Sequence, residues 1–156
     1  MGVSGCGKSS VGQRLADTLN VPFIEGDSFH SPENIAKMAA GIALTDEDRA
    51  GWLQSLQEQI RSARENNSGL VISCSALKRR YRDVLRAGDP ELHFAHLSGS
   101  RELIASRMQE RTGHYMPLSL LDSQLAALEP LQADEQGIEL DILCQPQDLV
   151  STILQS

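Results

Sequence analysis

The stretch that decides the fold is residues 1–12, "MGVSGCGKSSVG", in which residues 2–9 read G-x-x-x-x-G-K-S. Glycines at positions 2, 5 and 7 let the backbone curl so that successive N–H groups point into one concavity. A helix expected from about Ser9 offers its unpaired N–H groups and the positive end of its dipole to the same place. The pattern predicts a loop that holds the phosphates of a nucleoside triphosphate.

Two side chains of this loop carry chemistry of their own. Lys8 can reach the β- and γ-phosphates, and the Ser9 hydroxyl suits a Mg²⁺ ion that keeps most of its waters. A chance Gly/Ser-rich turn is the alternative, but the apolar spacing of "VGQRLADTL" directly after the loop favours a helix there. The predicted nucleotide site comprises Gly2, Val3, Ser4, Gly5, Cys6, Gly7, Lys8, Ser9 and Ser10.

Composition limits the remaining possibilities. With 156 residues and 40% hydrophobic content, the chain is most simply one domain over 1–156. A net charge of −7 argues against nucleic acid or an anionic membrane as a partner. The three cysteines are odd in number and widely spaced, which argues against a disulfide framework or a zinc site and favours a reducing, cytoplasmic location. No apolar run approaches the length of a membrane span.

Short apolar strands alternate with helical patterns along the chain. Strands are expected within residues 21–27, 69–77, 92–99 and 138–143, and helices within 31–41, 45–69, 78–88, 100–113, 118–130 and 146–155. This alternation predicts an α/β fold, a parallel sheet with helices on both faces. Ligands of such folds bind beyond the carboxyl ends of the strands.

Two acidic residues follow the first expected strand. Asp27 comes directly after "PFIE" and would lie beside the γ-phosphate, where a carboxylate can orient a hydroxyl and accept its proton. Glu25 points to the same face and could hold a water of the Mg²⁺ ion. Solvated loop acids are the alternative for both, and it weighs more for Glu25.

Basic residues gather at two further places. Lys78 and Arg82 lie four apart at the start of a helix that follows a strand, where an anionic group would bind. Arg107 and Arg111 lie four apart before "TGHYMP", a pattern that suits a lid over residues 107–117 that neutralises transition-state charge. A solvated basic face is the alternative at the first place, and the second pattern is not specific when taken alone.

Taken together, the sequence resembles a known family over nearly its whole length. The stretches that carry the resemblance are "GVSGCGKSSVG", "GDSFHSPENIAKMAAGIALTDEDR", "CSALKRRYRDVLR", "GHYMPLSLLDSQLAALEP" and "ADEQGIELDI". They are similar to the gluconokinases, carbohydrate kinases of the shikimate-kinase-like P-loop group. The resemblance implies a P-loop NTPase-type fold, transfer of the γ-phosphoryl of ATP to the 6-hydroxyl of D-gluconate with Mg²⁺, and a homodimer.

The resemblance also implies roles for single residues. Lys8, Asp27, Arg107 and Arg111 match the catalytic groups, with Asp27 orienting the substrate, and Ser9 and Glu25 match the metal side. The residues that match the polar groups around the sugar acid are Asp27, His30, Lys37, Arg49, Lys78, Arg82 and His114. Arg82 or Arg49 are the first choices for the gluconate carboxylate, since a guanidinium binds a carboxylate in bidentate fashion.

The sequence departs from the family pattern at several positions. Glu25 stands where an Asp is usual, and Cys6 where a small residue without a thiol is usual; a thiol at a helix N-terminus raises the hypothesis of reversible oxidation that blocks ATP binding. Residues 141–146 replace a D-x-D-Q-P pattern, so adenine-side contacts are expected to differ in detail.

The family also carries an apolar strand before the phosphate loop, often ending in Met. Met1 stands at that position, which suggests an internal residue taken for the start and a central strand upstream of it. Without that strand, two strand edges inside the sheet would be unpaired. The competing explanation is a true start at Met1 and a sheet that has closed up.

Two alternatives to a gluconate kinase stay open at this point. One is another kinase of the same group, such as a shikimate-type kinase. The other is a nucleotide-binding module without catalysis, for which Asp27 would serve no purpose.

Overall fold

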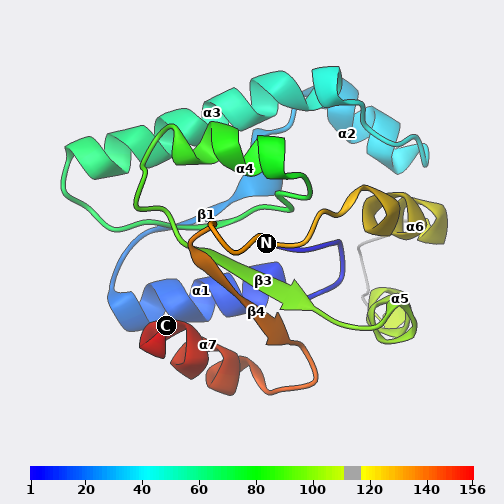
Figure 1. The fold of residues 1–156 in the computed structure, drawn as a ribbon. Helices are drawn as coiled ribbons and strands as arrows, with labels where there is room; N and C mark the ends of the chain where they lie inside the picture. The colour runs from blue at the N-terminus through cyan, green and yellow to red at the C-terminus, as the bar shows by residue number, and fades with distance from the viewer. Residues whose placement is uncertain (111–116) are drawn as a thin grey trace.

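The computed structural model describes residues 1–110 and 117–156 of the chain (Figure 1). Its strands are β1 (Phe23–Glu25), β2 (Val71–Ser73), β3 (Phe94–Ser98) and β4 (Gly137–Asp141). Its helices are α1 (Lys8–Leu19), the 3-10 helix η1 (Gly26–Phe29), α2 (Pro32–Ala39), α3 (Asp46–Glu65), α4 (Arg79–Arg86), α5 (Arg101–Glu110), α6 (Leu118–Ala127) and α7 (Pro146–Gln155). The predicted alternation of strands and helices is confirmed, and η1 is an addition to it.

The strands form two parallel pairs. β1 pairs with β2, with Ile24 opposite Ile72, and β3 pairs with β4, with His96 opposite Glu139. Among the described residues no ladder joins β2 to β3. The sequence analysis predicted a parallel sheet in which two inner strand edges stay unpaired without a strand before the phosphate loop. The structure shows two halves of a sheet, with residues 1–2 lying between them.

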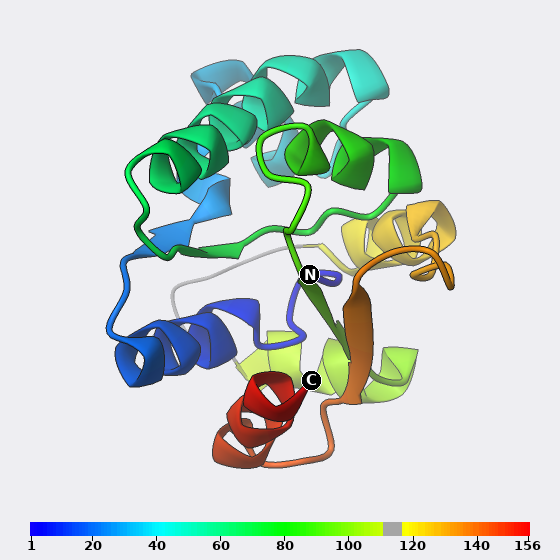
Figure 2. The ribbon, with the colours of Figure 1, turned by 60° about the vertical axis from the view of Figure 1, so that its left-hand side comes forward.

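Helices cover both faces of the strands. α3 packs against α4 on one side, and α1 packs against α7 on the other (Figures 1 and 2). The apolar face predicted for α3 is confirmed, because Trp52, Leu53, Leu56 and Ile60 are all buried. The structure thus has the layered α/β architecture that the sequence pattern predicted.

Local sequence signals explain where the helices begin. Thr45 and Asp48 form a reciprocal capping box at the start of α3, and Ser31 caps α2 with a proline at the first helical position. α1 differs, because its N-cap residue Gly7 has no side chain to satisfy the first N–H groups. Within the described ranges no helix is both long and apolar enough to cross a membrane.

Candidate active site

The phosphate loop leads into α1 through residues with left-handed backbone. Gly5 and Gly7 have φ of 81° and 95°, which only glycine adopts readily. A Cβ placed on Gly7 would meet no atom within 4 Å, so the loop is open on that side. Because no side chain caps α1, the N–H groups of its first turn are left for an anionic ligand.

Other residues of the loop anchor it to the protein. Val3 and Cys6 are buried in the core, and the N–H of Ser4 donates to Oε1 of Gln124 on α6 at 2.7 Å. The Lys8 ammonium donates to the Val3 carbonyl at 3.0 Å. Because the Cys6 thiol is buried, its observed role is packing, and the oxidation hypothesis receives no support from accessibility.

Ser9 and Glu25 lie in direct contact, as expected for two residues on one metal. The Ser9 hydroxyl donates to Oε2 of Glu25 at 2.5 Å, and the Ser73 hydroxyl donates to its Oε1. One hydroxyl and one carboxylate beside a phosphate loop fit a Mg²⁺ ion, which binds few protein oxygens and keeps several waters. Glu25 thereby links the ends of β1 and β2 to the first turn of α1.

Asp27 follows Glu25 on the rigid turn η1. The Trp52 indole N–H donates to the Gly26 carbonyl at 2.8 Å, and a Cβ on Gly26 would come within 2.2 Å of the Ser73 carbonyl oxygen. The turn is therefore held tightly against the end of β2, and only glycine fits there. The Asp27 side chain is exposed, two residues from the Ser9–Glu25 contact.

His30, which ends η1 three residues after Asp27, is buried. Its ring stacks on Trp52 with centroids 4.2 Å apart, and Asn34 lies 3.4 Å from its Nδ1. Burial lowers the pKa of His30 below its ordinary value, with Arg49 adding to the effect and Asp27 opposing it. The imidazole is therefore neutral at pH 7 and can accept or donate a hydrogen bond.

The first turn of α3 brings three predicted substrate cations together. Arg49 belongs to this turn, Lys37 of α2 pairs with Asp48 at 2.9 Å, and Lys78 at the start of α4 pairs with Asp46 at 3.2 Å. The Thr45 backbone N–H, followed by Lys37, lowers the pKa of Asp48 to about 2, so this carboxylate is charged. The grouping that the resemblance implied is thus present for these residues.

Tyr81 lies at the centre of this cationic group. Its ring is 5.4 Å from the Arg49 guanidinium and 5.8 Å from the Lys78 ammonium. Nη1 of Arg49 donates to the Tyr81 oxygen at 3.0 Å and to the Leu44 carbonyl at 2.9 Å. Asp46 accepts from the Tyr81 hydroxyl and from Lys78. These contacts hold positive charge at the starts of α3 and α4, and Arg49 is close enough to His30 to help lower its pKa.

Arg82 is not brought into this group. Its side chain is 0% exposed, and its guanidinium is bound by Glu135 at 2.7 Å and 3.0 Å and by the carbonyls of Ala76, Leu77 and Pro130. The resemblance to the gluconokinases placed Arg82 among the residues around the sugar acid, and its helical spacing to Lys78 suggested an anion site. In the structure Lys78 is only the N-cap of α4, and Arg82 points into the protein.

The remaining predicted residues belong to the lid. Arg107 lies near the end of α5, and its Nη2 donates to the Ile142 carbonyl at 2.8 Å, next to the 141–146 segment. Arg111 and His114, with most of the expected 107–117 lid, lie outside the described residues. Their roles stay predictions.

Sequence reasoning missed the anionic and hydroxyl partners of the site. Asp46, Asp48 and Tyr81 hold the cations, and Ser73 holds Glu25. Asp46 and Asp48 were visible in "LTDEDR", where they indicated only a helix start. Ser73 could have been inferred from its place at the end of an apolar strand, one of the positions where ligands gather.

Comparison with known proteins agrees with this geometry. The shikimate kinase family model matches residues 4–138. The thermosensitive gluconokinase of Escherichia coli K12 is 51% identical over 138 residues, which cover 88% of this chain and 74% of that protein.

Two solved structures are also similar. A sugar kinase from Janibacter sp. HTCC2649, in an unliganded structure, has a TM-score of 0.95 and 52% identity, covering 99% of this chain and 90% of the other. A gluconokinase from Sinorhizobium meliloti 1021 has a TM-score of 0.90 and 47% identity, covering 99% and 87%. With its phosphate loop, its acidic residues Glu25 and Asp27 at and just after the end of β1, and these relatives, the chain belongs to the gluconokinase family of P-loop kinases.

Proposed function

We propose that the protein transfers the γ-phosphoryl group of ATP to the 6-hydroxyl of D-gluconate, and is thus a phosphotransferase with an alcohol group as acceptor. The observation that carries this proposal is the setting of Asp27: it is an exposed acid on η1, two residues after Glu25, and α3, which carries Arg49, packs against η1. That position suits a substrate whose hydroxyl meets the γ-phosphate while its carboxylate meets cations. The gluconokinase relatives support the same assignment.

Each group of residues in the proposed site has its own chemical role. The N–H groups of α1 and Lys8 bind the phosphates, and a Mg²⁺ ion held at Ser9 and Glu25 would supply charge neutralisation on them. Asp27 orients the acceptor hydroxyl and takes its proton. Arg49 is our choice for the gluconate carboxylate, because the Arg82 guanidinium is fully occupied inside the protein. Homodimerisation, the cytoplasmic location and the absence of a nucleic-acid partner stay predictions.

A substrate panel tests the function directly. ADP release from Mg·ATP is measured with D-gluconate, shikimate and no acceptor. We expect turnover with gluconate well above both other reactions, since the site must bind the carboxylate and the terminal hydroxyl of its substrate at the same time. Turnover with shikimate alone would favour a shikimate-type kinase. Bound ATP without turnover on any acceptor would favour the non-catalytic module.

The metal assignment makes a separate prediction. We expect Glu25→Gln to raise the Mg²⁺ concentration needed for half-maximal activity by roughly tenfold, because one charged oxygen is lost from the ion's hydration sphere. Titration of activity with Mg²⁺ at saturating ATP measures this. Glu33→Gln, on an exposed position of α2, is the matched control and should leave the titration unchanged. An identical Mg²⁺ dependence for Glu25→Gln would remove Glu25 from the metal site.

A further inference from the structure

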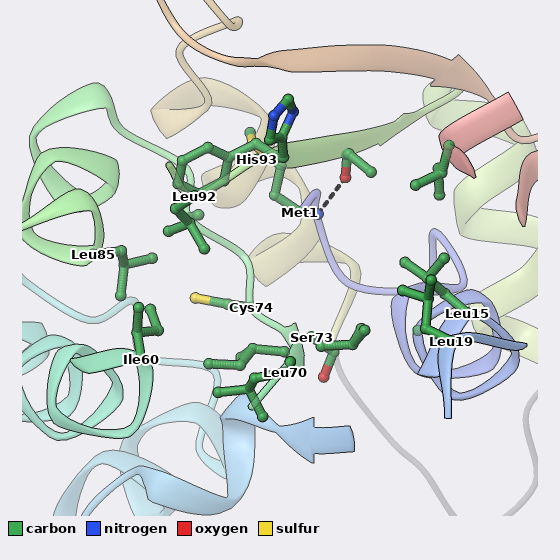
Figure 3. A pocket seen from close by; sticks show the side chains of 18 of the residues that line it. Met1, Leu15, Leu19, Ile60, Leu70, Ser73, Cys74, Leu85, Leu92 and His93 are labelled. Carbon is green, nitrogen blue, oxygen red and sulfur yellow. Dashed lines mark hydrogen bonds between the residues drawn. The ribbon is translucent and has the colours of Figure 1, made fainter. Parts of the chain in front are cut away.

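The cavity drawn in Figure 3 is not suited to a sugar acid. Its lining includes Leu15, Leu19, Ile60, Leu70 and Leu85, whose side chains offer no hydrogen bond to a hydroxyl or a carboxylate. The cationic group on α2, α3 and α4 offers both charge and hydrogen-bond donors. On the proposed function, recognition of the substrate carboxylate therefore falls to that group.

The cations of this group differ in whether an acid of the protein already neutralises them. Those with a carboxylate partner are Lys37 with Asp48, and Lys78 and Arg80 with Asp46. In the part of the chain that the structure describes, Arg49 has no acidic partner. The carboxylate of a substrate would supply the opposite charge that Arg49 lacks there.

A neutral oxygen, not an acid, holds the Arg49 side chain. Nη1 of its guanidinium donates to the Tyr81 hydroxyl oxygen at 3.0 Å and to the Leu44 carbonyl at 2.9 Å. Its Nε and Nη2 make no hydrogen bond with the described residues, so the edge of the fork that can bind a carboxylate in bidentate fashion stays open. The hydroxyl thus fixes the guanidinium without cancelling its charge.

Tyr81 is itself held in a fixed orientation. Its side chain on α4 is only 3% exposed, and α4 packs against α3 (Figure 1). Its hydroxyl donates its hydrogen to Asp46 in the first turn of α3. Because that hydrogen is committed to Asp46, the oxygen is left to accept from Arg49. The acid, the hydroxyl and the guanidinium therefore form a chain with one hydrogen-bond direction.

We propose that Tyr81 is a positioning residue that determines substrate specificity: its hydroxyl orients the Arg49 guanidinium so that the open edge of the fork binds the carboxylate of a sugar acid. Tyr81 acts through Arg49 and binds no substrate atom itself. This inference rests on the proposed function, since it takes gluconate as the substrate.

Tyr81→Phe tests the proposal because it removes the hydroxyl and keeps the ring. We expect KM for gluconate to rise roughly tenfold, as for the loss of one hydrogen bond to a charged group. Both kcat and KM for ATP should stay within about twofold of the parent, since binding of the carboxylate is remote from the phosphoryl group. Ser55→Ala is the matched control, because its hydroxyl on α3 donates to the Gly51 carbonyl and makes no hydrogen bond to Arg49. It should leave KM unchanged.

A double-mutant cycle separates positioning from a general loss of structure. Arg49→Lys keeps the charge but has no fork, and we expect it to raise KM for gluconate more than Tyr81→Phe does. The double variant should have the KM of Arg49→Lys alone, because Tyr81 acts only through the guanidinium. Additive effects of the two substitutions would overturn the proposal.

The remaining outcomes are also decisive. A Tyr81→Phe protein that loses kcat, ATP binding and Tm together, or is too unstable to assay, would show that the hydroxyl has a structural role only. A parent that turns over gluconate beside a Tyr81→Phe variant with unchanged KM would overturn this inference alone. A parent without gluconate turnover would overturn the proposed function and this inference with it.

Discussion

An Asp27→Asn variant is expected to lose kcat by roughly 10²–10⁴ while binding ATP as the parent does. Asparagine keeps the size of the side chain and can still accept a hydrogen bond, but it cannot take up the proton of the acceptor hydroxyl. Steady-state kinetics with gluconate give kcat, and calorimetric titration with Mg·ATP gives the affinity.

The geometry explains why the loss should fall on kcat. Asp27 lies on η1, whose backbone is fixed by the Trp52–Gly26 hydrogen bond, so the carboxylate is positioned before substrate arrives. Its side chain makes no hydrogen bond or ion pair with the residues that the structure describes. Because the carboxylate is not bonded to the phosphate loop or Lys8, its replacement should leave the nucleotide site unchanged.

Asp17→Asn is the matched control, because Asp17 is an exposed acid on α1 that contacts only Gln13. It should keep kcat close to that of the parent. An Asp27→Asn protein whose kcat stays within about threefold of the parent would show that Asp27 is not the base. A variant that also lost ATP binding would point instead to a role in shaping the nucleotide site.

The sequence predicted the elements of the fold well because their signals are local. Caps at Ser31 and Thr45, the glycine-rich loop and the apolar spacing of α3 all act within a few residues of where they are read. The pairing of strands is a long-range property. β1 pairs with β2 and β3 pairs with β4 across long stretches of the chain, and the local patterns of these strands do not specify their partners.

The residues of the candidate site were likewise predictable where the signal is local and not where it is long-range. Ser9, Glu25 and Asp27 were predictable because they follow directly from a motif and a strand end. The position of Arg82 was not predictable, because neither the resemblance nor its spacing to Lys78 indicates whether the side chain points to the site or into the protein, and α4 begins only at Arg79. The partner of Arg82, Glu135, lies 53 residues away along the chain, and no local pattern indicates that pairing.

An Arg82→Met variant is expected to lose about 3–5 kcal/mol of unfolding free energy at pH 7, because it leaves the Glu135 carboxylate buried and largely uncompensated. For a chain of this size the loss corresponds to a fall in Tm of roughly 6–20 °C. Among the described residues, Arg86, 3.0 Å from Glu135 and partly exposed, would remain as its cationic partner. Thermal and urea denaturation measure the change.

The pH dependence separates this cause from a simple loss of packing. Burial by itself would raise the pKa of Glu135, but hydrogen bonds from Arg82, the Gln132 N–H and Arg86 hold it at about 2. The pair therefore stabilises the parent fully above about pH 4.5, and this stabilisation is lost as pH falls toward about 2. In Arg82→Met the effect of burial dominates and raises the pKa of Glu135. Protonation of this carboxylate then removes the buried charge that destabilises the variant. The gap in Tm between variant and parent should narrow between pH 7 and about pH 4.

Arg79→Met is the matched control, because Arg79 pairs with Asp134 in the same segment but at the surface. An exposed pair is screened by solvent, so the fall in Tm of this variant should be only a small fraction of the fall in Arg82→Met. The double variant Arg82→Met/Glu135→Leu should recover much of the lost stability, since it removes the unpaired charge. If the double variant were as unstable as Arg82→Met alone, the guanidinium contacts to the carbonyls of Ala76 and Leu77 would be the main contribution. In that case Arg82 acts chiefly by holding the turn that presents Lys78 to the site.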